Sequence, residues 1–161
     1  MLKRLIIIIS IIIITGCSLS NNPNSKTEEL LGKYQSLDNS IILSPKTLAN
    51  DNNLSIDLEK EYTELIKKQY QSMSYEIKDT KEDGDKATVT VEIEVLDYKK
   101  IINQTNGPID DNYHKRLIDK LKQAHDKVTY TIDITLTKDN RKNWETEPLT
   151  TDEENKLLGI Y

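Results

Sequence analysis

Two long stretches of the chain alternate strictly between apolar and polar residues. Apolar residues occupy every second position in residues 87–95, with threonines and glutamates between them, and residues 128–136 repeat the pattern. A period of two places the two sets on opposite faces of a β-strand. We therefore expect two long strands of an antiparallel sheet that is buried on one face and exposed to solvent on the other. Shorter alternation over residues 73–77, before the turn dipeptide Asp83-Gly84, and a short segment around Trp144 predict two further strands.

Helical spacing precedes these strands. Apolar residues recur at i, i+4, i+7 and i+8 from Leu58, which predicts an amphipathic helix over residues 56–71. An earlier apolar stripe runs from Leu30 to Ile41 at about helical spacing. Thr27 fits the N-cap of that earlier helix, because two glutamates then lie in its first turn, where carboxylates suit the helix dipole.

The remaining segments predict shorter elements. Ser44-Pro45 indicates a loop, Asp97 is placed to cap a short helix, and a longer helix is expected over residues 110–126. Thr151–Glu154 has the pattern of a capping box for a last helical turn. Helices segregated to one face of an antiparallel sheet make an α+β fold. We expect one such domain over residues 27–161.

The first sixteen residues differ from all the rest. Lys3 and Arg4 precede a run from Leu5 to Ile14 that is apolar apart from Ser10. This is the positive n-region and apolar h-region of a secretory signal. A membrane-spanning helix needs about 20 apolar residues. Residues 1–16 therefore predict an export signal and not an anchor helix.

The segment after the apolar run, Ile14-Thr15-Gly16-Cys17, resembles a lipobox, the cleavage and acylation site of bacterial lipoproteins. The resemblance implies cleavage between Gly16 and Cys17 and a diacylglyceryl thioether on Cys17, which is the only cysteine of the sequence. Two acyl chains hold a protein on a membrane, whereas one gives marginal binding. The alternatives are an ordinary secretory signal that ends in a chance cysteine, or an uncleaved short anchor. The lipobox implies a lipid-anchored protein on the extracytoplasmic face of the cell membrane.

Removal of the signal changes the charge of the chain. Residues 17–26 are polar and without periodicity, which predicts a flexible tether between the lipid and the domain. The mature chain keeps 22 − 2 = 20 basic and 27 acidic side chains, a net charge of −7. That balance, with no basic stripe, argues against a nucleic acid partner. The expected partners are the membrane and an envelope protein or cell-wall component.

Several segments of the chain carry a second resemblance. Residues 83–93, residues 128–132, Trp144 and residues 157–161 are together similar to a widespread group of uncharacterised lipoproteins from Gram-positive bacteria. Such proteins resemble the nuclear transport factor two-like, cystatin-like cone. The resemblance implies a curved antiparallel sheet of about four strands wrapped on N-terminal and central helices. It covers residues 27–161 and implies no activity.

The two histidines of the chain are the first candidates for chemistry. His114 and His125 both fall on the helix predicted over residues 110–126, and their separation of 11 residues corresponds to about 16 Å along its axis. They cannot bind one metal ion from that helix. We expect His114 at the surface near the helix start, and we predict neither a metal nor a cofactor.

Cone-shaped domains can also host an acid-base pair of a carboxylate with a histidine or tyrosine inside the cavity. Asp133, Glu92 and Glu94 alternate with core-facing residues, so we expect them on the solvated sheet face, and no catalytic residue is predicted. Trp144 is expected in the core. The run Lys138–Lys142 is expected to be a solvated turn, which would contact anionic headgroups if it faced the bilayer.

Two classes of function follow from these expectations. The first is a non-catalytic binding or interaction module of the envelope, and the second is a small hydrolase or isomerase that uses a cavity acid-base dyad. A buried carboxylate with a shifted pKa beside a histidine or tyrosine in a closed cavity would favour the enzyme. A cone filled by leucine, isoleucine and tyrosine side chains would favour the binding module.

Overall fold

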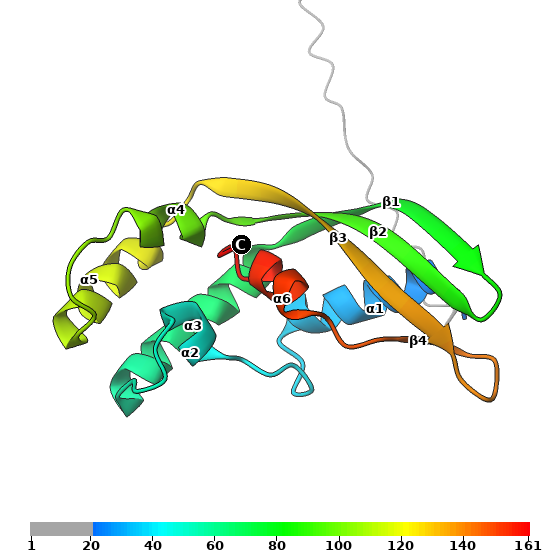
Figure 1. The fold of residues 1–161 in the computed structure, drawn as a ribbon, viewed down its shortest axis with the longest axis horizontal. Coiled ribbons are helices and arrows are strands. Elements are labelled where there is room, and N and C mark those ends of the chain that lie inside the picture. The colour runs from blue at the N-terminus through cyan, green and yellow to red at the C-terminus, as the bar shows by residue number, and fades with distance from the viewer. Residues whose placement is uncertain (1–20) are drawn as a thin grey trace, which may run out of the picture.

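The structure is a computed structural model that describes residues 21–161, and it has the predicted α+β architecture (Figure 1). The signal peptide predicted over residues 1–16 and the cleavage site at Gly16 and Cys17 lie outside the described residues. Four antiparallel strands form one sheet in the order β1-β2-β3-β4. The strands are β1 (Ser74–Asp83), β2 (Lys86–Leu96), β3 (Lys127–Lys138) and β4 (Trp144–Thr146).

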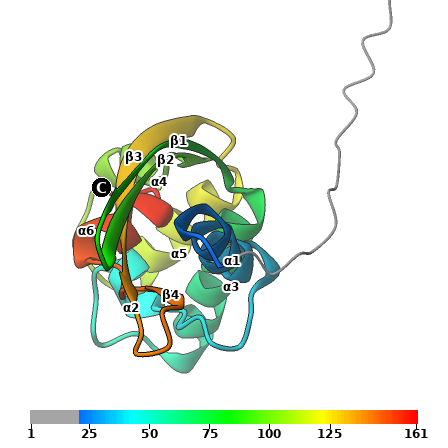
Figure 2. The ribbon, with the colours of Figure 1, turned by 90° about the vertical axis from the view of Figure 1, so that its right-hand side faces the viewer.

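The described residues also form six helices beside this curved sheet. They are α1 (Pro23–Ser36), α2 (Pro45–Ala49), α3 (Ile56–Ser72), α4 (Tyr98–Asn103), α5 (Asp111–Lys122) and α6 (Thr151–Leu157). The sheet arches over α1 and α3, as Figures 1 and 2 show. The helices α2, α4 and α5 gather at one end of the molecule, and the β1-β2 and β3-β4 turns form the other end.

The inner face of the sheet is the centre of the core. Val89, Val91 and Ile93 of β2 are 0% exposed, and so is Ile134, the partner of Val89 on β3. The helices complete one hydrophobic cluster with the buried side chains Leu31, Tyr34, Tyr62, Leu65, Ile66, Leu117, Leu121 and Leu157. Burial of a large apolar side chain contributes about 1.5–3 kcal/mol before entropy is subtracted. The concave side of the sheet is thus filled by leucine, isoleucine, valine and tyrosine.

The outer face of the sheet carries the polar half of the alternation, as predicted. Asp133 is exposed, and Glu92 and Glu94 are partly exposed on the same face. Thr90 donates its hydroxyl to Asp133 at 2.7 Å, and the Lys127 ammonium lies 2.7 Å from Glu94. These carboxylates therefore pair across strands in solvent and do not point among the helices.

The first helix begins earlier than the sequence analysis predicted. Asn22 is its N-cap and accepts a hydrogen bond from the backbone N–H of Ser25 at 2.8 Å, and Pro23 is the first helical residue. Thr27 is not the cap; it lies inside the helix, completely buried. Asparagine followed by proline is itself a strong helix start. Residues 23–26 are thus helical, and the predicted tether was too long at this end.

Three smaller differences concern helix ends. Pro45 opens the short helix α2, where a loop was expected. The capping box of α6 uses Thr150 and Glu153, one residue before the predicted pair, and both of its reciprocal hydrogen bonds are present. The helix α5, predicted over residues 110–126, has Asp110 as its N-cap but ends at Lys122, so His125 lies beyond it.

A buried glutamine fastens the C-terminal segment to the sheet. The Gln69 side chain is 0% exposed; its amide donates to the carbonyls of Leu96 at 2.9 Å and Leu158 at 2.8 Å, and its oxygen accepts from the Leu96 N–H. Gly159 has a φ of +69°, and a Cβ there would collide with the Leu96 carbonyl and the Gln69 amide. Only glycine allows this approach. The contacts hold the chain after α6, including Ile160, in place.

Candidate functional site

A groove of about 520 Å³ lies at the end where α2, α4 and α5 gather. Its walls come from α2 and the connection to α3, from α4 and α5, and from α6 and the C-terminal residues. Segments between residues 46 and 160 therefore meet in it. A hollow of about 580 Å³ between α3 and α5 is slightly larger, but only those two helices and the α3 N-cap line it. A hollow of about 510 Å³ near α3 is lined almost entirely by that one helix and has no comparable enclosure.

The groove has an apolar floor and a polar rim. Tyr113 and Leu117 of α5 form buried parts of the floor, and Ile109 at its edge is 59% exposed. Large apolar side chains exposed beside a concave surface are typical of binding sites. The polar lining includes the amides Asn50, Asn52, Asn103 and Asn155. Each primary amide can both donate and accept hydrogen bonds, so the rim suits a backbone or another polar chain.

Two lysines give the groove its positive charge. Lys46 of α2 lies 3.3 Å from Glu59, so its charge is already partly balanced. Lys99 of α4 is exposed, and its ammonium has no hydrogen-bond or ion-pair partner in residues 21–161. A free ammonium at the edge of an apolar floor favours a ligand that ends in, or carries, a carboxylate.

Behind the wall of the groove, three polar side chains form a chain of contacts. The Tyr62 hydroxyl on α3 lies 2.8 Å from Nδ1 of His114 on α5. Nε2 of the same imidazole lies 3.1 Å from the carboxylate of Asp51, in the connection between α2 and α3. The arrangement joins three segments that are distant in the sequence, and it resembles in its residue types the acid-base pairs considered above.

The electrostatics fix the direction of these hydrogen bonds. Hydrogen bonds from the Asn53 backbone N–H and, secondly, from the His114 imidazole hold the pKa of the Asp51 carboxyl below its usual range. Asp51 is therefore ionised near neutral pH. Burial raises the pKa of the Tyr62 hydroxyl, which therefore stays protonated. Tyr62 then donates to Nδ1, and the Nε2–H of His114 donates to Asp51.

The exposure of these groups decides what they can do. Tyr62 is 0% exposed and His114 is 2% exposed, and neither lines the groove. Only the Asp51 carboxylate reaches its surface, with a lowered and not a raised pKa. A group that cannot touch a ligand cannot transfer a proton to it. The three residues therefore fasten α3, α5 and the Asp51 loop together, which fixes the shape of the groove wall.

The prediction that His114 lies at the surface was wrong. His114, Leu117 and Leu121 are spaced at i, i+3 and i+7, so the imidazole belongs to the apolar stripe of α5 that packs against α3. The periodicity already contained this information. His125 lies after α5 and is exposed, with Nε2 3.4 Å from Asp126. The structure does not bring the histidines together, and residues 21–161 contain no cluster of three metal-ligating side chains.

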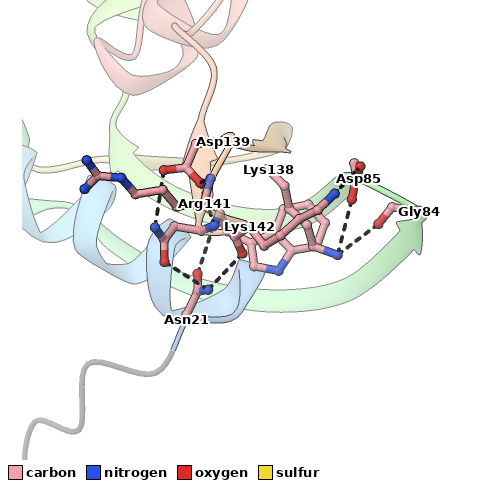
Figure 3. Close-up of polar contacts among 9 residues, drawn as sticks. Asn21, Gly84, Asp85, Lys138, Asp139, Arg141 and Lys142 are labelled. Carbon is pink, nitrogen blue, oxygen red and sulfur yellow. Dashed lines mark hydrogen bonds and ion pairs between the residues drawn. The ribbon is translucent and has the colours of Figure 1, made fainter.

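The opposite end of the molecule contains the basic run singled out in the sequence. Residues 138–143, here called the tip loop, connect β3 to β4 and fold against the β1-β2 turn (Figure 3). The Lys142 ammonium lies 2.9 Å from Asp85, and the Lys138 ammonium donates to the Gly84 carbonyl at 3.0 Å. Trp144, 4% exposed as predicted for a core residue, has the Lys138 ammonium 4.4 Å from its ring centroid.

The tip loop also holds the start of the described chain. Asn21 donates to the Lys142 carbonyl at 3.1 Å and accepts from the Trp144 N–H at 2.8 Å (Figure 3). The place where the chain enters the domain is therefore fixed beside this loop. No pattern in the sequence predicts these contacts, because Asn21 is more than 120 positions from Lys142 and Trp144.

Comparison with known proteins adds no relative. Neither a family model, nor a curated protein, nor a solved structure matches this chain. Within residues 21–161, no helix has the length and apolar character needed to cross a membrane.

Proposed function

We propose that the protein is an extracytoplasmic lipoprotein, held on the cell membrane by a diacylglyceryl group on Cys17, whose domain is a non-catalytic module that binds a protein partner. The lipobox resemblance and the preceding export signal support the anchor. The resemblance to uncharacterised Gram-positive lipoproteins with a nuclear transport factor two-like domain supports the same assignment.

The observation that carries the binding role is the groove at the end of the domain away from Asn21. Its apolar floor accepts a side chain, its amides match the polar groups of a peptide backbone, and Lys99 supplies an unpaired positive charge. We propose that its occupant is a segment of an envelope protein with an apolar side chain next to a carboxylate. Such a segment would complement Ile109 and Lys99 together.

The second class of function, a cavity enzyme, is not proposed. The concave side of the sheet is filled by apolar side chains and tyrosines. The imidazole and hydroxyl of the polar chain are enclosed, and the carboxylate beside them has a lowered pKa. Each of these observations favours a binding module over an acid-base reaction.

The proposal is tested by crosslinking in living cells and recovery through a C-terminal tag. We expect one partner in near-stoichiometric yield with the natural chain, and at least a tenfold lower yield with Ile109→Asp or Lys99→Glu. Ile42→Asp is the matched control, because Ile42 is 84% exposed and does not line the groove. A partner recovered equally well with all four proteins would refute the groove as the binding site.

The anchor is tested separately by labelling with a fatty acid. The natural chain should take up the label and float with membranes, and Cys17→Ser should do neither. If the serine variant is still labelled, the acyl group is not on Cys17 and the lipoprotein proposal is wrong.

A further inference from the structure

We propose that the tip loop is the membrane-facing surface of the domain, and that Arg141 and Lys142 contact the anionic headgroups of the lipid bilayer. This inference rests on the proposed anchor at Cys17. It assigns a partner to the charged run that the binding function does not use.

The first argument is the length of chain between the anchor and the tip loop. The Asn21 side chain forms hydrogen bonds with the Lys142 carbonyl, the Asn143 side chain and the Trp144 N–H. Only four peptide steps separate Cys17 from Asn21, and in any conformation they span at most about 14 Å. An acylated Cys17 lies at the bilayer surface. The tip loop is therefore held within reach of the headgroups, whereas α5 lies at the opposite end of the molecule (Figure 1).

The second argument is charge. The described chain has 20 basic and 27 acidic side chains, a net charge of −7, so an anionic surface repels it as a whole. The tip loop with its facing turn has the opposite sign. It carries three cations, Lys138, Arg141 and Lys142, against two carboxylates, Asp85 and Asp139. A loop with a net positive charge on a short tether is favoured when it faces the anionic surface.

The third argument is the availability of the cations. The Asp139 carboxylate accepts the backbone N–H groups of Arg141 at 2.7 Å and of Asn143 at 2.8 Å, so it is engaged in shaping the loop. The Arg141 guanidinium has no partner in residues 21–161 and extends away from the other side chains of the cluster (Figure 3). Lys142 is 70% exposed, and such an exposed ion pair exchanges readily for a phosphate.

Range matters because salt screens these charges within about 8 Å under physiological conditions. A tether of forty residues would leave the domain outside that range for most of the time. Four peptide steps keep Asn21 within about 14 Å of the anchored residue, which is less than two screening lengths. The fixed contacts of Asn21 therefore turn a weakly basic loop into one that is always near the surface. Each cation held at an anionic surface raises the population of the contacting state about fivefold.

The experiment uses the full-length lipidated protein in lipid vesicles. Because Cys17 is acylated and is the only cysteine, Asn140→Cys introduces a single reactive thiol in the tip loop. A fluorophore on that thiol is quenched by a lipid with a spin label in its headgroup if the loop lies among headgroups. The matched control is Asn112→Cys, an exposed asparagine at the start of α5. Vesicles contain phosphatidylcholine alone or with one third phosphatidylglycerol.

We expect strong quenching at position 140 in phosphatidylglycerol vesicles and none at position 112. Adding Arg141→Gln and Lys142→Gln should lower quenching at position 140 at least fivefold, and 1 M salt should have a similar effect. Equal quenching with and without the two cations, or in vesicles without phosphatidylglycerol, would overturn the headgroup contact. So would quenching at position 112 alone. If Cys17 itself reacts with the fluorophore, the anchor is wrong and the inference falls with it.

Discussion

The two ends of the domain are built by different means. At the groove end, the buried side chains of Tyr62 and His114 join α3 to α5, and Gln69 joins α3 to the sheet, inside an apolar cluster. At the tip-loop end, exposed ion pairs and side-chain to backbone hydrogen bonds of Asn21 connect turns in solvent. Hydrogen bonds in the interior are costly to lose, whereas exposed ion pairs contribute little.

This difference in construction makes the groove end rigid and lets the contacts of the tip loop be replaced. The groove wall keeps one shape because the Tyr62 and His114 side chains that join its helices are buried, which suits the recognition of one partner. The tip loop is held by contacts that salt and headgroups can replace, which suits a surface that rests on lipid. The single tryptophan, Trp144, lies at the tip-loop end, so its fluorescence reports on that end, while far-ultraviolet circular dichroism reports on all helices.

The largest effect is expected for Gly159→Ala at the groove end. The new Cβ would displace the Leu96 carbonyl or the Gln69 amide, and alanine would be held in a left-handed conformation. We expect a loss of about 2–5 kcal/mol in the free energy of unfolding, measured by urea denaturation. Both probes should shift together, because the Gln69 contacts belong to the common core.

The matched control for that variant is Gly32→Ala. Gly32 lies inside α1, and a Cβ there meets no atom within 4 Å. Alanine is the better helix former, so this exchange should stabilise the domain by about 0.5–1 kcal/mol. A destabilisation of the two variants by similar amounts would contradict the assigned role of Gly159.

The second-largest effect is expected for Tyr62→Phe. This exchange removes the hydroxyl that contacts His114 and leaves the buried Nδ1 of His114 without a partner. The expected loss is about 1–3 kcal/mol in the free energy of unfolding. Tyr75→Phe is the control, since Tyr75 is only partly buried and its hydroxyl makes no hydrogen bond in residues 21–161. Its effect should stay within about 0.5 kcal/mol. Equal effects of the two variants would show that the contact with His114 adds nothing.

The sequence predicts those features of both ends that depend on local patterns of residues. The alternation in residues 87–95 and 128–136 survives as β2 and β3, because a one-residue slip would expose the whole core face. Asp97 caps the short helix that it was predicted to cap, since capping is a local interaction. The helix ends were predicted less accurately: Thr27, the predicted N-cap of the first helix, lies inside α1.

Long-range polar contacts are where sequence reasoning stopped. The periodicity that predicts α5 places His114 on its buried stripe, but it does not say that Tyr62 and Asp51 meet the imidazole. The groove was not predicted at all, because side chains between residues 46 and 160 line it and no local pattern links them. The contact of Asn21 with the tip loop depends in the same way on the completed fold.

The smallest effect is expected for Asn21→Ala, which removes the contacts of the tip loop with the start of the domain. These hydrogen bonds are exposed or partly buried, so the expected loss is about 0.5–1.5 kcal/mol. Because the variant loosens one end only, the Trp144 transition should occur at lower urea concentration than the loss of helical circular dichroism. Asn140→Ala, an exposed asparagine of the same loop, should leave both transitions where they are. Coincident transitions in Asn21→Ala would mean that the tip-loop end and the groove end unfold as one cooperative unit, and the distinction between them would then be one of chemistry and not of stability.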